Sequence, residues 1–227
     1  ILPPEQGATR GKTTIETCLL KQLFYDQANI LHVDCSSSST DAAFCYDAAN
    51  HAASGIALQA MSVPPHMVKC YLTCVQKMQY FLQTGHGLAT TSYGGSRDSI
   101  CMGLTQGSGA SPGTWSAVST VIVGAYKRQN YGATLRSGWS GDDVHLAALL
   151  YVDDTDLLHL PPNASMSTAD TVQWMQQAIN CWAHLLQATG GSLKPSKCYW
   201  YLMTYKFING QAILCTRQEL KDYNITI

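Results

Sequence analysis

Two adjacent carboxylates, Asp153 and Asp154, follow the short apolar segment 147–151, and Leu157 and Leu158 follow them in turn. These apolar flanks predict two strands with the acidic pair at the turn between them. Neighbouring carboxylates repel each other, so holding them side by side is costly unless a cation compensates their charge. Carboxylates and substrate phosphates are ligands through which proteins bind Mg²⁺. The pair is therefore a candidate metal site, and a solvated Asp-Asp turn is the structural alternative.

A second source of carboxylates lies in the segment DAAFCYD at residues 41–47. Two-metal phosphoryl transfer needs carboxylates from separate chain segments, so that two ions about 3.5–4 Å apart can clamp the attacking and leaving oxygens. Asp41 can be this second contributor. Asp34 and Asp47 are rival candidates, and Asp47 also suits a helix N-cap.

Two further segments carry polar groups suited to a phosphate-bearing substrate. Glycines such as Gly107 allow a backbone to approach a ligand closely, and Gln106 beside it can hydrogen-bond a nucleotide or a template. A plain loop before a helix that starts at Ser111 and Pro112 is the alternative. Downstream, a lysine in segment 190–197 can give a proton to a leaving pyrophosphate or neutralise its charge. A solvated surface lysine is the alternative there.

Taken in this order, the four segments resemble reverse transcriptases over nearly the whole chain. Segment 106–112 resembles the family's Q-G-x-x-x-S-P, segment 151–154 its Y-x-D-D box, and segment 41–47 its first catalytic segment D-x-x-x-A-F-D, with Cys45 and Tyr46 in place of Ala and Phe. Segment 190–197 resembles the later G-x-x-L-x-x-x-K. Upstream, segment 6–10 is less closely similar to the Q-x-G-F-R pattern of the fingers.

The resemblance implies a role for each charged residue. Asp41 and Asp153 would bind two Mg²⁺ ions, with Mn²⁺ as a substitute, and Asp154 would support them as a third metal-site carboxylate. Lys197 would serve the leaving group. These four residues form the expected catalytic set.

The resemblance also implies the substrate. Tyr46 stands five residues after Asp41, where reverse transcriptases carry an aromatic ring that excludes a ribose 2′-OH and so selects deoxynucleotides. RNA-dependent RNA polymerases usually have an acidic residue there and Gly-Asp-Asp in the later box. The expected substrate-binding residues are Tyr46, Gln106, Gly107, Tyr151 and Arg10.

The implied function is that of an RNA-directed DNA polymerase from a retroelement, nearer to non-LTR retrotransposons or group-II-like elements than to retroviruses. Its partners would be a primer on an RNA or DNA template and dNTPs. Three alternatives stay open: an RNA-dependent RNA polymerase, a decayed or domesticated copy that only binds RNA or protein, and an unrelated α+β domain with an acidic turn.

The elements that must position these residues indicate an α+β fold. Hydrophobic periodicity predicts helices at residues 14–25, 47–61, 65–82, 114–126 and 168–188, and strands at 145–151, 157–160, 198–207 and 212–216. Glycines predict a hairpin within 85–95, a loop at 103–109 and a turn at Asn209 and Gly210. The serine-rich run 35–40 is typical of a loop, because a polar strand would bury poorly.

The resemblance assigns these elements to a polymerase palm, an antiparallel sheet backed by helices, with part of the fingers. Residues 1–33 would be partial fingers, 34–205 the palm with an inserted fingers-like segment, and 206–227 the start of the palm–thumb hairpin.

Bulk composition sets outer bounds on function. The chain has 14 Lys and Arg against 15 Asp and Glu, a formal net charge of −1, which lacks the basic excess of a free-standing nucleic-acid binder. Its nine cysteines lack zinc-site spacing and are typical of reduced intracellular thiols. No apolar run is long enough to cross a bilayer. We expect an intracellular fragment of a longer polymerase, without a membrane segment and of undetermined oligomeric state.

Overall fold

The computed structural model describes residues 3–8, 11–43, 45–96, 101–105, 107–161 and 166–227. The chain divides into two compact units. Unit 1 comprises Ile1–Ala43, Ile122–Ala188 and Ser192–Ile227, and unit 2 comprises Phe44–Val121 and Thr189–Gly191. Each unit is described by itself below.

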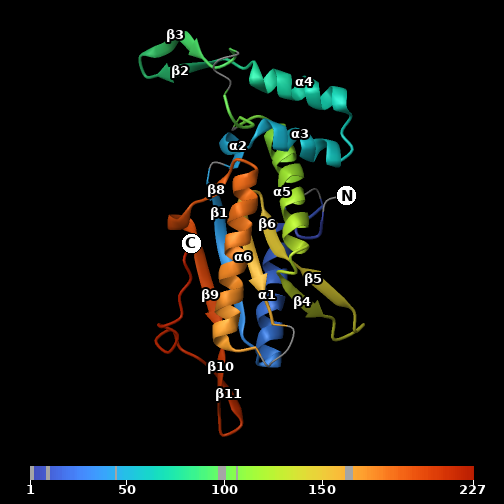
Figure 1. Cartoon of the computed structure of the whole chain (residues 1–227), viewed down its shortest axis with the longest axis vertical. Coiled ribbons are helices and arrows are strands. Elements are labelled where there is room, and N and C mark those ends of the chain that lie inside the picture. Colours follow the sequence, from blue (N-terminus) through green and yellow to red (C-terminus); the bar gives the residue numbers. More distant parts are fainter. Residues whose placement is uncertain (1–2, 9–10, 44, 97–100, 106, 162–165) are drawn as a thin grey trace. The chain divides into compact units, whose positions relative to one another are not determined.

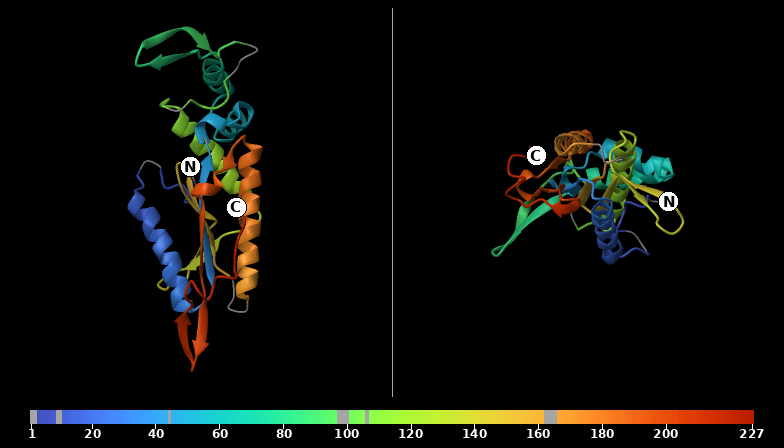
Figure 2. Two further views of the ribbon diagram at one scale, coloured as in Figure 1. Left: turned by 90° about the vertical axis from the view of Figure 1, so that its left-hand side faces the viewer. Right: turned by 90° about the horizontal axis from the view of Figure 1, so that it is seen from below.

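Unit 1 is built on one antiparallel sheet with the strand order β6-β7-β1, in which β8 and β9 both pair with the free edge of β1. The strands are β1 (Cys35–Ala43), β6 (Ala148–Tyr151), β7 (Asp154–His159), β8 (Ser192–Leu193) and β9 (Tyr199–Met203). Helices α1 (Thr14–Leu31) and α6 (Thr168–Ala188) lie on opposite faces of this sheet (Figures 1 and 2). The α+β prediction of an antiparallel sheet backed by helices is confirmed.

Local sequence signals explain both covering helices. The Thr13 side chain caps α1 by accepting a hydrogen bond from the Glu16 backbone N–H, and the Glu16 side chain accepts one from the Thr13 backbone N–H, which is a capping box. Helix α1 continues beyond the predicted residue 25 and buries Phe24 and Ala28. Helix α6 has the predicted bounds, because its buried side chains recur at helical spacing: Thr171, Met175, Ala178, Ile179, Trp182 and Leu186.

The core beneath α1 joins the helix to the sheet. It contains Phe24 and Ala28 from α1, Cys35 from β1, Leu149 from β6 and Leu158 from β7, each at most 2% exposed. This packing fixes the sheet face on which the acidic residues lie.

The serine-rich run that was expected to form a loop is the central strand β1, so that prediction was wrong. Three of its hydroxyls find partners that offset their burial. Ser38 Oγ donates to the Tyr199 carbonyl at 3.2 Å, Thr40 Oγ1 donates to the Thr155 carbonyl at 3.0 Å, and Ser37 Oγ lies 2.6 Å from the Tyr25 hydroxyl.

Two predicted helices are shorter than expected. The helix predicted at 47–61 is two helices, α2 (Cys45–Ala48) and α3 (His51–Ala60), because Asn50 interrupts it and caps α3 through hydrogen bonds to the backbones of Ala52 and Ala53. Asp47 lies inside α2 and is not an N-cap. The helix predicted at 65–82 ends at Gln76, as α4 (Pro65–Gln76), and β2 (Tyr80–Thr84) follows.

Two predicted strands are each divided between separate sheets. Residues 145–151 belong to β5 (Asp143–Leu146), which pairs with β4 (Ala133–Arg136), and to β6. Residues 198–207 belong to β9 and to β10 (Tyr205–Ile208), which pairs with β11 (Gln211–Leu214). The hairpin turn predicted at Asn209 and Gly210 is confirmed, with φ of 51° and 79°.

Unit 2 contains α2, α3, α4, the hairpin of β2 and β3 (Gly87–Tyr93), and the first part of α5 (Ser111–Lys127). The hairpin predicted within 85–95 is confirmed, but its strands begin earlier, at Tyr80. Across the described residues, every helix is too short or too polar to span a membrane.

Candidate active site

The central feature of the site is a cross-strand pair of carboxylates in unit 1. In the antiparallel register of β1 and β7, Asp41 lies opposite Asp154, and Tyr151 of β6 lies opposite Asp154 on its other side. Side chains of opposed residues share one face of a sheet. Two segments more than a hundred residues apart therefore bring their carboxylates together, whereas Asp34 is engaged elsewhere as acceptor of a 2.6 Å hydrogen bond from Thr168.

The turn that carries Asp153 is tight and strained. Because Tyr151 pairs with Asp154, only Val152 and Asp153 connect β6 to β7. Val152 has a φ of 61°, a conformation that glycine adopts readily and a β-branched residue rarely does. Left-handed backbone costs an L-residue roughly 1–2 kcal/mol. Such strain persists where the surrounding structure imposes it, and it clusters at functional sites.

Lys197 is anchored beside Asp41 by the chain that precedes it. Strand β8 pairs Leu193 with Ala42 at the end of β1, and the Lys194 backbone N–H donates to the Asp41 carbonyl at 3.0 Å. The 3₁₀ helix η1 (Pro195–Lys197) then turns the chain back. Its last residue places the Lys197 ammonium 2.9 Å from Asp41 Oδ2, although the lysine side chain stays 60% exposed.

Charges in the site act on one another. Partial burial, followed by the charges of Asp153 and Asp41, raises the pKa of Asp154 above its ordinary value. The hydrogen bond and charge of Asp41, aided by Asp153 and Asp154, raise the pKa of Lys197. The four residues expected to be catalytic are thus electrostatic neighbours, and the three carboxylates crowd one another enough to favour a compensating cation.

The donors available to a metal ion are carboxylate oxygens, which suit Mg²⁺. Within the described part of the chain, no three His, Cys, Asp or Glu side chains stand grouped as ready-made metal ligands. This is compatible with Mg²⁺, which proteins usually hold through one or two carboxylates plus substrate phosphates and not in an all-protein cage. Asp41, Asp153 and Asp154 fit that kind of site.

The remaining expected substrate residues have different positions. Tyr151 is 39% exposed, and its hydroxyl lies 3.4 Å from Thr14 Oγ1 at the start of α1. Arg10 and Gln106 lie outside the described residues.

Tyr46 and Gly107 belong to unit 2. The Leu104 backbone N–H donates to the Tyr46 carbonyl at 2.7 Å, so the loop that leads to Gly107 is fastened to α2. Gly103 approaches α2 so closely that a Cβ there would lie 2.4 Å from the Asp47 carbonyl oxygen, which requires glycine. Gly107, with φ of 92°, faces open space.

Sequence reasoning missed an ion pair on the same sheet face. Lys21 of α1 lies 2.8 Å from Asp156 Oδ2, and Asp156 is two residues beyond Asp154 on β7. The alternation of side chains along a strand was a usable signal for Asp156, because residues two apart share a face. No comparable signal marked Lys21.

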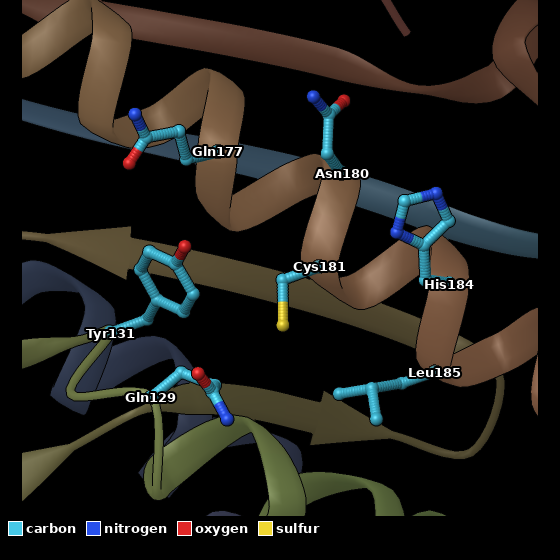
Figure 3. Close-up of a pocket in the computed structure, with 7 residues that line it drawn as sticks. All are labelled: Gln129, Tyr131, Gln177, Asn180, Cys181, His184 and Leu185. Carbon is cyan, nitrogen blue, oxygen red and sulfur yellow. The ribbon is translucent and has the colours of Figure 1, made fainter.

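A shallow pocket of about 460 Å³ lies elsewhere in unit 1, between α6 and the chain that follows α5 (Figure 3). Its lining is mostly uncharged and polar: Gln129, Tyr131, Gln177, Asn180, Cys181, His184 and Leu185. None of the expected site residues lines it.

Comparison with known proteins finds similarity in structure alone. No protein-family profile matches the chain, and no curated protein matches its sequence. Apo telomerase from Candida tropicalis, truncated from its C-terminal domain, superposes with a TM-score of 0.56 at 13% identity, over 93% of this chain and 39% of that one. Telomerase from the same organism in complex with the TWJ fragment of telomeric RNA gives 0.57 at 11% identity, over 87% of this chain and 30% of that one.

This chain has a nucleic-acid polymerase fold. At these identities the similarity establishes the fold alone. The polymerase fold here spans less than two fifths of the length of the two telomerase chains. In this polymerase fold, Asp41, Asp154 and Lys197 lie at one end of the sheet in unit 1.

Proposed function

We propose that the chain is the polymerase core of an RNA-directed DNA polymerase, which adds deoxynucleotides to a primer 3′-OH. The observation that carries this proposal is the convergence of Asp41 with Asp154 across β1 and β7, with Asp153 at the adjoining turn and the Lys197 ammonium 2.9 Å from Asp41. We further propose a retroelement origin of the non-LTR type, on the strength of the sequence segments that resemble reverse transcriptases.

Asp41 and Asp153, supported by Asp154, would hold two Mg²⁺ ions, or Mn²⁺ in their place. When bound, these ions lower the pKa of the primer hydroxyl and stabilise charge on the reacting phosphate. The carboxylates contribute by standing on paired strands and a two-residue turn, which leaves them little freedom to move apart.

Lys197 would act on the leaving group. Asp41 raises its pKa, so the ammonium keeps its proton at neutral pH. Negative charge develops on a pyrophosphate oxygen as its bond to the α-phosphate breaks. Lys197 can then transfer the proton or remain as a neutralising charge.

Tyr46 would select the sugar, and Gln106 and Gly107 would contact the incoming nucleotide. Sequence choice would come from base pairing with the template. Contacts to an RNA template would go mainly to its backbone and 2′-OH groups, because side chains cannot read the deep major groove of A-form helices.

Primer extension tests the proposal. The chain is given a labelled primer on an RNA template with dNTPs and Mg²⁺ or Mn²⁺, beside the double variant Asp153→Asn, Asp154→Asn. We expect extension by the wild type and its loss in the variant. The matched control is Asp142→Asn, Asp143→Asn, which neutralises a second adjacent acidic pair, on the exposed hairpin of β4 and β5, and should extend normally.

Equal extension by the wild type and the Asp153, Asp154 variant would refute the assignment of these carboxylates. A folded full-length parent protein that binds primer–template but never extends it would instead identify a decayed or repurposed copy.

Sugar selection is tested with Tyr46→Ala. Removing the ring should open space for a 2′-OH and lower the preference for dNTPs over rNTPs, in kcat/KM, by roughly tenfold or more. Tyr46→Phe keeps the ring and should keep the preference. An unchanged preference in Tyr46→Ala would reject this residue as the gate.

A further inference from the structure

We infer that Tyr199 and Tyr201, on the edge strand β9, form a contact surface for the nucleic-acid strand whose end is extended at Asp41. This pair is named the β9 tyrosines. The inference rests on the proposed function and deepens it, because it identifies the residues that hold the strand behind its reacting end.

Strand register places the β9 tyrosines on the same sheet face as Asp41. Ser39 of β1 lies opposite Tyr199, and Ser37 lies opposite Tyr201. Ser37, Ser39 and Asp41 alternate along β1 and therefore share one face, and cross-strand partners share that face too.

The β9 tyrosines are open to solvent although their neighbours on this face are covered. Tyr199 is 59% exposed and Tyr201 is 56% exposed. Helix α1 reaches the strands beside them, where Lys21 pairs with Asp156 and the Tyr25 hydroxyl lies 2.6 Å from Ser37 Oγ. Helix α1 thus covers this face as far as β1. Beyond β1, the β9 tyrosines form an exposed aromatic surface next to the candidate active site.

Spacing along the sheet suits a strand that ends at Asp41. Residues two and four positions from Asp41 lie about 7 Å and about 13 Å away along β1. One strand of a stacked duplex advances about 3.4 Å per nucleotide. Tyr199 and Tyr201 would therefore lie beside the nucleotides roughly two and four positions behind the reacting end. The chain also runs directly from Lys197 into β9, which makes the surface continuous with the site.

Charge on this face favours aromatic contact over phosphate neutralisation. Lys21 is paired with Asp156, and Lys197 is paired with Asp41. The whole chain carries a formal net charge of −1. Tyrosine rings can pack on bases and sugars without a net positive charge, and their hydroxyls can donate to phosphate oxygens. The position of the β9 tyrosines on the face of Asp41, and not the charge of the chain, assigns them to a nucleic-acid strand.

The test measures binding and needs no turnover. Fluorescence anisotropy gives the Kd of the chain for hairpin primer–templates with two, four or eight paired nucleotides behind a fixed primer end. Five proteins are compared: wild type, Tyr199→Ala with Tyr201→Ala, Tyr199→Phe with Tyr201→Phe, Trp139→Ala, and Asp153→Asn with Asp154→Asn. Trp139 is a fully exposed aromatic residue on the hairpin of β4 and β5 and serves as the matched control. Thermal unfolding confirms that each variant is folded.

For the wild type we expect Kd to fall as pairing extends from two to eight nucleotides. The double tyrosine variant should lose this gain, with a Kd for the longest hairpin raised roughly tenfold or more. Its salt dependence should stay that of the wild type, because no phosphate-neutralising cation is removed. Tyr199→Phe with Tyr201→Phe should keep most of the gain, and both the Trp139 and the Asp153, Asp154 variants should keep it.

An equal Kd for the wild type and the double tyrosine variant on every hairpin would overturn the inference. So would a change in oligomeric state caused by the tyrosine substitutions without a change in Kd, since β9 would then contact protein. Failure of the proposed function looks different: the length-dependent gain would persist and depend on the tyrosines, while no variant and no wild-type sample extends a primer.

Discussion

His159 is a buried titratable residue outside the candidate active site. It is 2% exposed, and its ring stacks on Trp174 with centroids 5.5 Å apart. Neither ring nitrogen has a hydrogen-bond partner among the described residues. Burial lowers the pKa of His159 to about 4, from an ordinary value of 6.5. As the pH falls, His159 therefore binds a proton in the unfolded chain at a higher pH than it does in the native state.

This difference makes stability depend on pH. Between pH 6.5 and about 4 the unfolded chain binds the extra proton, so the free energy of unfolding should fall as the pH falls, by about 3 kcal/mol in total. Urea unfolding of the wild type and of His159→Leu between pH 4.5 and 8 measures the effect. The variant should show a shallower decline over this window, and equal declines would assign the pH dependence to other groups.

Lys197 can act on the leaving group by donating a proton or by neutralising its charge, and substitutions at this position distinguish the two roles. Lys197→Gln should slow single-turnover nucleotide addition by about 10²-fold, the scale of a lost general acid, with little change in primer–template affinity. Lys194→Gln removes a neighbouring exposed lysine and should be nearly silent. Lys197→Arg keeps the charge but holds its proton too tightly to give it up. Full activity in that variant would indicate charge neutralisation, whereas a loss like that of Gln would indicate proton transfer.

Single residues were predictable where a short pattern carried chemistry. The crowding of Asp153 and Asp154 was readable from their adjacency, and the partner of Asp154 was among three candidates. Strand register was needed to bring Asp41 opposite Asp154. Lys21 was not predictable, because its contact with Asp156 joins positions 135 apart and leaves no local trace.

At the scale of elements, β1 shows why hydrophobicity alone failed. A strand rich in serine can be central if most of its buried hydroxyls find hydrogen-bond partners. Ser38→Ala should remove the hydrogen bond to the Tyr199 carbonyl, leave that carbonyl under-satisfied, and cost about 1 kcal/mol of unfolding free energy.

Ser36 offers a matched control on the same strand and face. Its buried Oγ has no hydrogen-bond partner among the described residues. Ser36→Ala should therefore be neutral or slightly stabilising. Chemical denaturation of the two variants measures the contrast, and equal losses of stability would mean that the hydroxyl hydrogen bonds do not hold β1 in the core.

Elements with a regular hydrophobic repeat were predicted well. The points at which one apolar run divides into two strands were not. Helix α6 has both of its predicted ends, because its apolar stripe is uninterrupted. The apolar run at 145–151 gave no sign that β5 and β6 enter different sheets at Ala147. Pairing partners decide such a division, and they lie elsewhere in the sequence.

At the scale of the whole molecule, the fold class was predictable and the arrangement of strands was not. Alternating helical and strand periods indicated α+β. The order β6-β7-β1, with β8 and β9 at the free edge of β1, depends on contacts between distant segments. The near-neutral net charge of the chain also did not predict where its charges gather. One sheet face brings Asp41, Asp154 and Asp156 together with Lys21 and Lys197.

The position of β1 in the chain has a consequence during synthesis. Its hydrogen-bonding partners emerge much later: Thr155 follows Thr40 by 115 positions, and Tyr199 follows Ser38 by 161. At about 5–20 residues per second, the nascent strand waits roughly 8–32 s for β9. An apolar β strand left unpaired for that time would invite aggregation on the ribosome. A strand of serines stays hydrated while it waits, so the same hydroxyls that complicate its burial also protect it before the sheet can close.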